Sequence, residues 1–118
     1  VLVVDDAKFI RHMLTRILRE MGHDVVGEAE NGREALSKFR KLRPDLVTMD
    51  ITMPEMDGLD ALTAILKEDP KAIVVMCSAL NDKPHVVQAL KLGAKDFLLK
   101  PFQQDRVVQA VSNALSRK

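Results

Sequence analysis

The stretch LVTMDITMPEMDG, residues 46–58, places Asp50 at the end of an apolar run and follows it with Pro54 and Gly58. A short hydrophobic run that is bounded by turn-forming residues predicts a buried β-strand. A carboxylate at the end of such a strand costs free energy, because it loses its water of hydration. We therefore expect Asp50 to have either a charged partner or a chemical role.

Four further segments have the same apolar, β-branched character, and the helix-length segments between them carry hydrophobic residues at helical spacing. The predicted strands cover residues 1–5, 24–29, 45–50, 72–77 and 96–100, and the predicted helices cover residues 9–21, 31–42, 58–68, 83–92 and 107–115. Strict alternation of strand and helix predicts an α/β fold, with a doubly wound parallel sheet and helices on both faces. The first, third and fourth strands are almost continuously hydrophobic and should be central.

The composition fits one domain, which we expect to span residues 1–118. Lys and Arg total 18 against 17 for Asp and Glu, so the net charge of +1 does not favour nucleic acid or a membrane surface. No apolar stretch approaches the ~20 residues of a membrane helix, and the single cysteine, Cys77, cannot form an internal disulfide. We expect a cytoplasmic protein, and the abrupt start on VLVV suggests that a few residues precede it in the natural chain.

Polar residues follow the predicted strands at their carboxyl ends. They are Asp5 and Asp6 after the first strand, Asp50 after the third, Ser78 after the fourth and Lys100 after the fifth. In an open parallel sheet, ligands bind beyond the carboxyl ends of the strands, where the strand order reverses. We therefore expect these five side chains to line one pocket.

Three carboxylates in one pocket repel each other unless a cation lies among them. Mg²⁺ is the expected cation, since it takes oxygen ligands and is usually held by one or two carboxylates together with phosphate. Lys100 would neutralise phosphate oxygens. An aspartate attacks phosphorus to give an acyl phosphate, and Asp50, central and next to a tight turn, is the best candidate nucleophile.

Four motifs contain these residues: VVDD with Asp5 and Asp6, MDITMPEMDG around Asp50, CSA with Ser78, and DFLLKPF with Lys100. In this order and spacing, the whole chain resembles a response-regulator receiver domain, and most closely the single-domain chemotaxis regulators. The resemblance implies a flavodoxin-like sheet of five parallel strands in the order 2-1-3-4-5, with five helices.

The resemblance also implies a role for each acidic residue. Asp50 would be the phosphoacceptor. Asp6, Asp50 and the backbone carbonyl of Thr52 would bind Mg²⁺, and Asp5 would assist through a water molecule.

Three further residues match the part of the family that responds to phosphorylation. Ser78 would be the switch hydroxyl that moves to bond the phosphate, Lys100 would pair with a phosphate oxygen, and Phe97 stands at the aromatic switch position. Phe97 lacks the hydroxyl of the tyrosine found in some members, so a contact made through that hydroxyl is not expected. The Lys100–Pro101 peptide bond is expected to be cis.

Thr52 and Leu80 occupy two positions that tune hydrolysis of the phosphate in this family. They follow the acceptor and the switch hydroxyl by two residues each. Our hypothesis is that apolar Leu80 hinders or fails to orient the attacking water.

The resemblance implies that a histidine kinase of the chemotaxis type is the phosphodonor. The expected output surface consists of the helix at 83–92, the strand at 96–100 and the last helix, including Val86, Lys91, Lys95 and Phe97, and it would contact the flagellar motor switch or another output partner. No direct contact with nucleic acid or membrane is expected. Such a protein is a signalling switch that promotes its own phosphorylation and dephosphorylation, not an enzyme.

Several alternatives remain open at this stage. The chain could be the receiver of a longer regulator with a methylesterase or DNA-binding output. An aspartyl-phosphate hydrolase of the haloacid dehalogenase type would need an acid where Thr52 stands, and a flavin binder would need a Ser/Thr/Gly-rich loop in place of DDAKF. An adaptor without phosphorylation chemistry is a further possibility, and Asp6 alone could simply cap the first helix.

Overall fold

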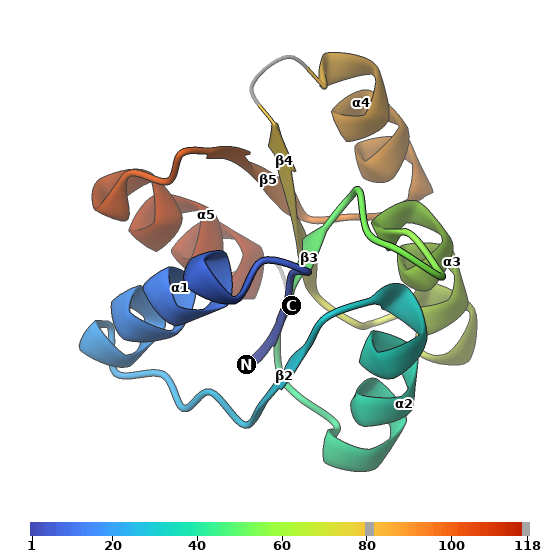
Figure 1. Cartoon of the computed structure of the whole chain (residues 1–118), viewed down its shortest axis with the longest axis horizontal. Helices are drawn as coiled ribbons and strands as arrows, with labels where there is room; N and C mark the ends of the chain where they lie inside the picture. Colours follow the sequence, from blue (N-terminus) through green and yellow to red (C-terminus); the bar gives the residue numbers. More distant parts are fainter. Residues whose placement is uncertain (80–81, 117–118) are drawn as a thin grey trace.

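Strands and helices alternate strictly along the chain in the computed structural model, which describes residues 1–79 and 82–116 (Figure 1). The strands in this part are β1 (Leu2–Val4), β2 (Gly27–Ala29), β3 (Val47–Asp50), β4 (Val74–Ala79) and β5 (Asp96–Lys100), and the helices are α1 (Lys8–Glu20), α2 (Gly32–Leu42), α3 (Gly58–Glu68), α4 (Lys83–Leu92) and α5 (Gln104–Ser116). Neighbouring strands pair in parallel in the order β2-β1-β3-β4-β5. The expected α/β sheet, with β1, β3 and β4 inside, is confirmed.

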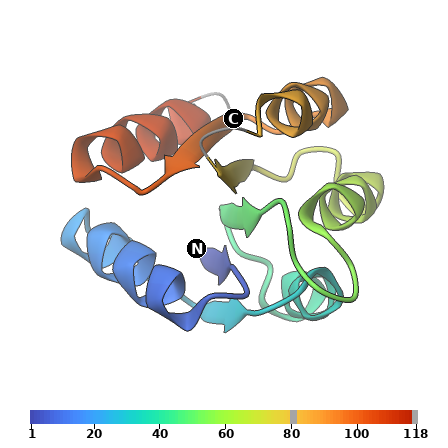
Figure 2. The same ribbon diagram turned by 45° about the horizontal axis from the view of Figure 1, so that its top comes forward.

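Helices cover both faces of the sheet, with α2, α3 and α4 on one side and α1 and α5 on the other (Figure 2). Side chains alternate between the faces along each strand, so that Leu2 and Val4 pack towards α2 and α3 while Val3 packs towards α1. Each fully buried side chain of this kind contributes about 1.5–3 kcal/mol through removal of apolar surface from water. Among the described helices, none has the length and apolar character needed to cross a bilayer.

The helices begin in different ways. Asn31 caps α2 by accepting the Glu34 N–H at 2.8 Å, and Asp57 caps α3 by accepting the Asp60 N–H at 2.9 Å. Helix α1 has Ala7 at its N-cap position, where no side chain caps it. The alternative that Asp6 is merely the cap of α1 is therefore wrong.

The predicted boundaries differ from the structure mainly at the strands. The first four strands begin later than predicted, and β4 continues to Ala79 because Ser78 and Ala79 still pair with Leu99 and Lys100 of β5. Ser78 therefore lies within β4, not after it. The helices predicted at 58–68 and 83–92 are confirmed at both ends.

Gly58 allows α3 to start directly against the end of β3. A Cβ atom at this position would lie 2.0 Å from the carbonyl oxygen of Asp50, and the Gly58 N–H donates to the Ile51 carbonyl at 2.7 Å. A side chain would force the two elements apart, which explains why glycine ends the MDITMPEMDG motif. The close approach fixes the backbone on which Asp50 stands.

Candidate functional site

The carboxyl ends of β1, β3 and β5 bring three of the predicted site residues together. The Lys100 ammonium lies 2.9 Å from Asp5 Oδ2 and 3.3 Å from Asp50 Oδ1. Since β4 lies between β3 and β5, the lysine side chain reaches across the end of β4 to the two carboxylates. Both acids are buried, whereas Asp6, the next residue after Asp5, is exposed.

Asp5, Asp6 and Asp50 form an acidic group in which each residue offers an oxygen atom within 4.8 Å of the others. Three carboxylates face a single ammonium group, so the ionised cluster would carry an excess of negative charge. A hard divalent cation matches both this charge and the all-oxygen donor set. The residues of this acidic group thus fit Mg²⁺.

The Asp50 carboxyl is held in an environment that disfavours its charge. Burial and then the negative charge of Asp5 raise the pKa of Asp50 to about 7, although Lys100 opposes this shift. For Lys100, burial favours the neutral form, but the hydrogen bond to Asp5 and the charge of Asp50 outweigh it and raise the pKa. The lysine therefore stays positively charged beside the acids.

Ser78 and Phe97 lie on the same face of the sheet. Phe97 pairs in register with Met76 and Leu99 pairs with Ser78, so Phe97 is a diagonal neighbour of Ser78. The Ser78 side chain is buried, and its hydroxyl donates to the Ala79 carbonyl at 3.1 Å. Phe97 is half-buried against the core beneath α2, α3 and α4.

Two further predictions concern the edges of the site. The Lys100–Pro101 peptide bond is cis, as predicted. Thr52 is exposed just beyond the end of β3, while Leu80 lies outside the described residues.

Arg106 of α5 was missed by the sequence reasoning. Its guanidinium lies over the Phe97 ring, 5.5 Å from the centroid, and Nη2 donates to the Phe97 carbonyl at 3.0 Å and to Asp96 Oδ1 at 3.2 Å. A cation in this position stabilises one orientation of the ring. Arg106 directly precedes Val107, which is buried. This position was the available sign in the sequence that Arg106 lies close to the core.

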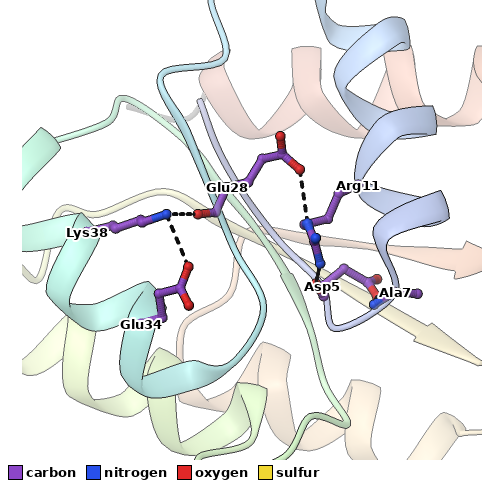
Figure 3. A network of polar contacts seen from close by, with 6 residues as sticks. All are labelled: Asp5, Ala7, Arg11, Glu28, Glu34 and Lys38. Atoms are coloured by element: carbon purple, nitrogen blue, oxygen red, sulfur yellow. Dashed lines mark hydrogen bonds and ion pairs between the residues drawn. The ribbon is translucent and has the colours of Figure 1, made fainter.

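Arg11 of α1 was missed as well. Figure 3 shows its side chain between the Asp5 carbonyl and the Glu28 carboxylate. Arg11 precedes the buried Leu14 and Leu18 by three and seven residues, so it falls on the inward stripe of α1. A charged residue on such a stripe signals a partner inside the fold.

Comparisons with known proteins identify the family of this chain. Residues 1–112 match the model of the response regulator receiver domain family. The chain is 55% identical to the chemotaxis protein CheY of Thermotoga maritima, over 95% of this chain and 93% of that protein.

Solved structures show the same relationship. CheY in the CheX–CheY–BeF3–Mg complex from Borrelia burgdorferi has a TM-score of 0.89 and 41% identity, covering 93% of this chain and 84% of that one. The receiver domain of NtrX from Brucella abortus has a TM-score of 0.93 and 36% identity, covering 99% and 98%. CheY is itself a known example of the 2-1-3-4-5 strand order, so this order is a property shared with relatives. The chain belongs to the response regulator receiver domain family and is closely related to the CheY chemotaxis regulators.

Proposed function

We propose that Asp50 is the phosphoacceptor of this response regulator and that a histidine kinase is the donor. The observation that carries the proposal is the contact of Asp50 Oδ1 with Lys100 Nζ at 3.3 Å, inside a group of three carboxylates. Phosphoryl transfer depends mainly on positioning and on neutralisation of charge. This pocket offers a nucleophile, a fixed ammonium group and a set of oxygen donors for a cation.

In the transfer, an Asp50 oxygen attacks phosphorus while the phosphorus–nitrogen bond of phosphohistidine breaks. The departing imidazole nitrogen keeps the bonding electron pair and takes up a proton from solvent, and the product is an acyl phosphate. Only the ionised carboxylate attacks, so the pKa of about 7 at Asp50 matters. Lys100 favours ionisation and then pairs with a phosphate oxygen.

Asp6, Asp50 and the backbone carbonyl of Thr52 would hold Mg²⁺, with Asp5 beside them. When bound, the ion supplies further neutralisation of the phosphoryl oxygens. A bound cation would offset the mutual repulsion of the three carboxylates. We therefore expect Mg²⁺ to raise both the free energy of unfolding and the rate of phosphorylation.

The response to phosphorylation would pass through Ser78, Phe97 and β5. A phosphate adds about −1.5 to −2 units of charge and strong acceptors. The Ser78 hydroxyl, which donates to the neighbouring Ala79 carbonyl, would turn to the phosphate, and the Phe97 ring would move into the space it leaves. The movement needs only to bias two packings that differ by a few kcal/mol.

The output surface would be the face formed by α4, β5 and α5. Val86 is buried at 5% exposure, so it supports this face from below, whereas Val87 and Leu90 expose 43% and 39% of their surface. Exposed apolar side chains of this kind suit contact with a partner protein. A CheX-type protein is one partner class, because the Borrelia relative is in complex with CheX. The flagellar motor switch is the second partner class that we propose, with the signalling in the cytoplasm.

Chemotaxis is favoured over another output by sequence identity. The fold likeness is as high for the NtrX receiver as for the Borrelia CheY, but identity rises from 36% with NtrX to 55% with Thermotoga CheY. Beryllofluoride-loaded protein should bind a flagellar motor switch protein more tightly than unloaded protein in a calorimetric titration. Equal affinities would favour the receiver of a different regulator.

The receiver and hydrolase alternatives differ in turnover. Phosphoramidate, a small donor with a phosphorus–nitrogen bond, should phosphorylate each protein molecule once with Mg²⁺, and a burst of about one equivalent should precede slow release of phosphate. p-Nitrophenyl phosphate should give no comparable multiple turnover. Repeated rapid hydrolysis of the monoester would instead identify an aspartyl-phosphate hydrolase.

A further inference from the structure

The turn between β1 and α1 carries two adjacent acids, and Arg11 holds it from one side. Arg11 Nη1 donates to the Asp5 carbonyl at 2.6 Å, while the Ala7 N–H donates to Asp5 Oδ1 at 2.9 Å (Figure 3). The Arg11 side chain is 13% exposed, although it is fully charged. This arrangement buries a guanidinium against a backbone carbonyl beside the acidic group.

The carbonyl that Arg11 contacts belongs to the peptide unit that joins Asp5 to Asp6. A peptide unit is planar, so a hydrogen bond that restrains its carbonyl also restrains the Asp6 N and Cα atoms of the same plane. Asp5 is locked by burial and by Lys100, but exposed Asp6 has no such support among its neighbours on the turn. Arg11 therefore restrains the backbone position from which the Asp6 side chain starts.

Arg11 is in turn oriented by Glu28 of β2. Its Nε donates to Glu28 Oε1 at 3.0 Å, and Glu28 is held by Lys38 of α2, which contacts the Glu28 carbonyl and lies 3.1 Å from Glu34. Figure 3 shows these groups as one chain of contacts from α2 through β2 to α1. A fork-shaped guanidinium with both edges occupied has little freedom to move.

We propose that Arg11, oriented by Glu28, is a positioning residue for the divalent-cation site, because it fixes the peptide between Asp5 and Asp6. The inference rests on the proposed function and deepens it. Among the described residues, Arg11 bonds the Asp5 backbone carbonyl and Glu28 and not the carboxylates of the acidic group, so it acts through the backbone. Removing a residue that orients the ligands of a metal typically weakens metal affinity about 10–100-fold.

A positioning role and simple electrostatics predict opposite effects of removing Arg11 on the affinity for Mg²⁺. Arg11 is a cation near the acidic group, so removing its charge should make the pocket more negative and tighten the binding of Mg²⁺. Positioning predicts that removal weakens binding. The direction of the change therefore distinguishes the two roles.

The experiment measures the dissociation constant of Mg²⁺ from amide shifts in ¹H–¹⁵N NMR, without a phosphodonor. The chain has no Trp or Tyr, so intrinsic fluorescence is not a suitable probe. The variants are Arg11→Met, Arg11→Lys and Glu28→Ala, and Arg16→Met is the matched control because Arg16 is an exposed arginine on the same helix. Thermal unfolding of each variant is recorded first. Glu28→Ala removes the carboxylate that orients Arg11 and leaves the residues of the turn between β1 and α1 unchanged.

The expected result is a roughly 10-fold weaker affinity for Arg11→Met, a smaller loss for Glu28→Ala, partial recovery in Arg11→Lys and no change in Arg16→Met. Phosphorylation by acetyl phosphate should be slow in Arg11→Met at low Mg²⁺ and normal at saturating Mg²⁺. Unchanged or tighter Mg²⁺ binding in Arg11→Met and in Glu28→Ala would overturn the positioning role of Arg11 but leave the proposed function standing. Failure of the unsubstituted protein to bind Mg²⁺ would overturn the proposed function with it.

Discussion

At the scale of single residues, the pocket combines groups that oppose each other. Asp5 and Asp50 are buried acids, and Lys100 contacts both. The positive charge of Lys100 favours the ionised form of Asp50. Burial and the charge of Asp5 nevertheless raise the pKa of Asp50 to about 7. A folded domain tolerates such a costly group where it serves reactivity.

The first prediction concerns the pH dependence of stability without metal. The pKa of Asp50 is about 7 in the folded protein and 3.8 in its ordinary state, so between these values the folded protein holds a proton that the unfolded chain has lost. The free energy of unfolding should therefore fall as pH rises through this window and level off above it. Asp50→Asn, which cannot ionise, should lack this part of the slope.

Urea unfolding in EDTA at several pH values from about 5 to 8 tests this prediction. The difference between the unsubstituted protein and Asp50→Asn removes the contributions of other titrating groups. Parallel curves for the two proteins would mean that Asp50 titrates normally.

The second prediction concerns Lys100. Lys100→Met leaves buried Asp5 without its cation and should lower the free energy of unfolding by about 3 kcal/mol in EDTA, as expected for a buried pair that loses one partner. Mg²⁺ should recover part of the loss, because it neutralises the same carboxylates. Lys91→Met on the exposed side of α4 is the control, and an equal loss in both variants would contradict a special role for Lys100.

The sequence predicted the acids and the lysine because each stands at a strand end, and parallel strands bring those ends together. It did not predict Arg11 or Arg106, because both are long side chains that reach across to backbone carbonyls. Every residue has a backbone carbonyl, so the residue types in a sequence do not reveal which carbonyl a long side chain contacts. Only the three-dimensional arrangement identifies which one is contacted.

At the scale of elements, the turn between β3 and α3 decides where the nucleophile stands. Gly58 lies against the Asp50 carbonyl, and Glu55 within the same turn has a positive φ of 67°. The β-strand boundaries were less predictable than this turn, since a strand ends where its neighbour stops pairing. Pairing with β5 carries β4 to Ala79, which hydrophobicity alone did not indicate.

The third prediction is that Gly58→Ala lowers the free energy of unfolding by about 1–3 kcal/mol, the usual cost of overpacking. The added methyl would meet the Asp50 carbonyl oxygen at 2.0 Å, so α3 and the end of β3 must separate. Phosphorylation of Asp50 should slow as a result. Denaturant unfolding and single-turnover phosphorylation measure the two effects.

Gly22→Ala provides the comparison. Gly22 has a φ of 89° and nothing within 4 Å of an added Cβ, so its substitution strains the backbone far from the site. It should lose stability but keep the rate of phosphorylation. Equal slowing in both variants would show that lost stability, not the position of Asp50, is responsible.

At the scale of the whole molecule, one sheet connects the pocket with the proposed output face. Strand β5 carries Phe97 near its start and Lys100 at its end, and α5 contacts the ring through Arg106. The alternation of strands and helices made the layered α/β fold predictable. The strand order came from resemblance, because hydrophobic runs reveal which strands are buried but not which are neighbours.

The measurement that tests the central claim most directly is the intact mass after incubation with acetyl phosphate, with and without Mg²⁺, for the unsubstituted protein and Asp50→Asn. We predict one added phosphoryl group that requires Mg²⁺ and is missing in Asp50→Asn. Reduction with borohydride should then locate the acyl phosphate at residue 50. Absence of the adduct together with failure to bind beryllofluoride, or an adduct that persists in Asp50→Asn, would contradict the assignment of Asp50 as the phosphoacceptor.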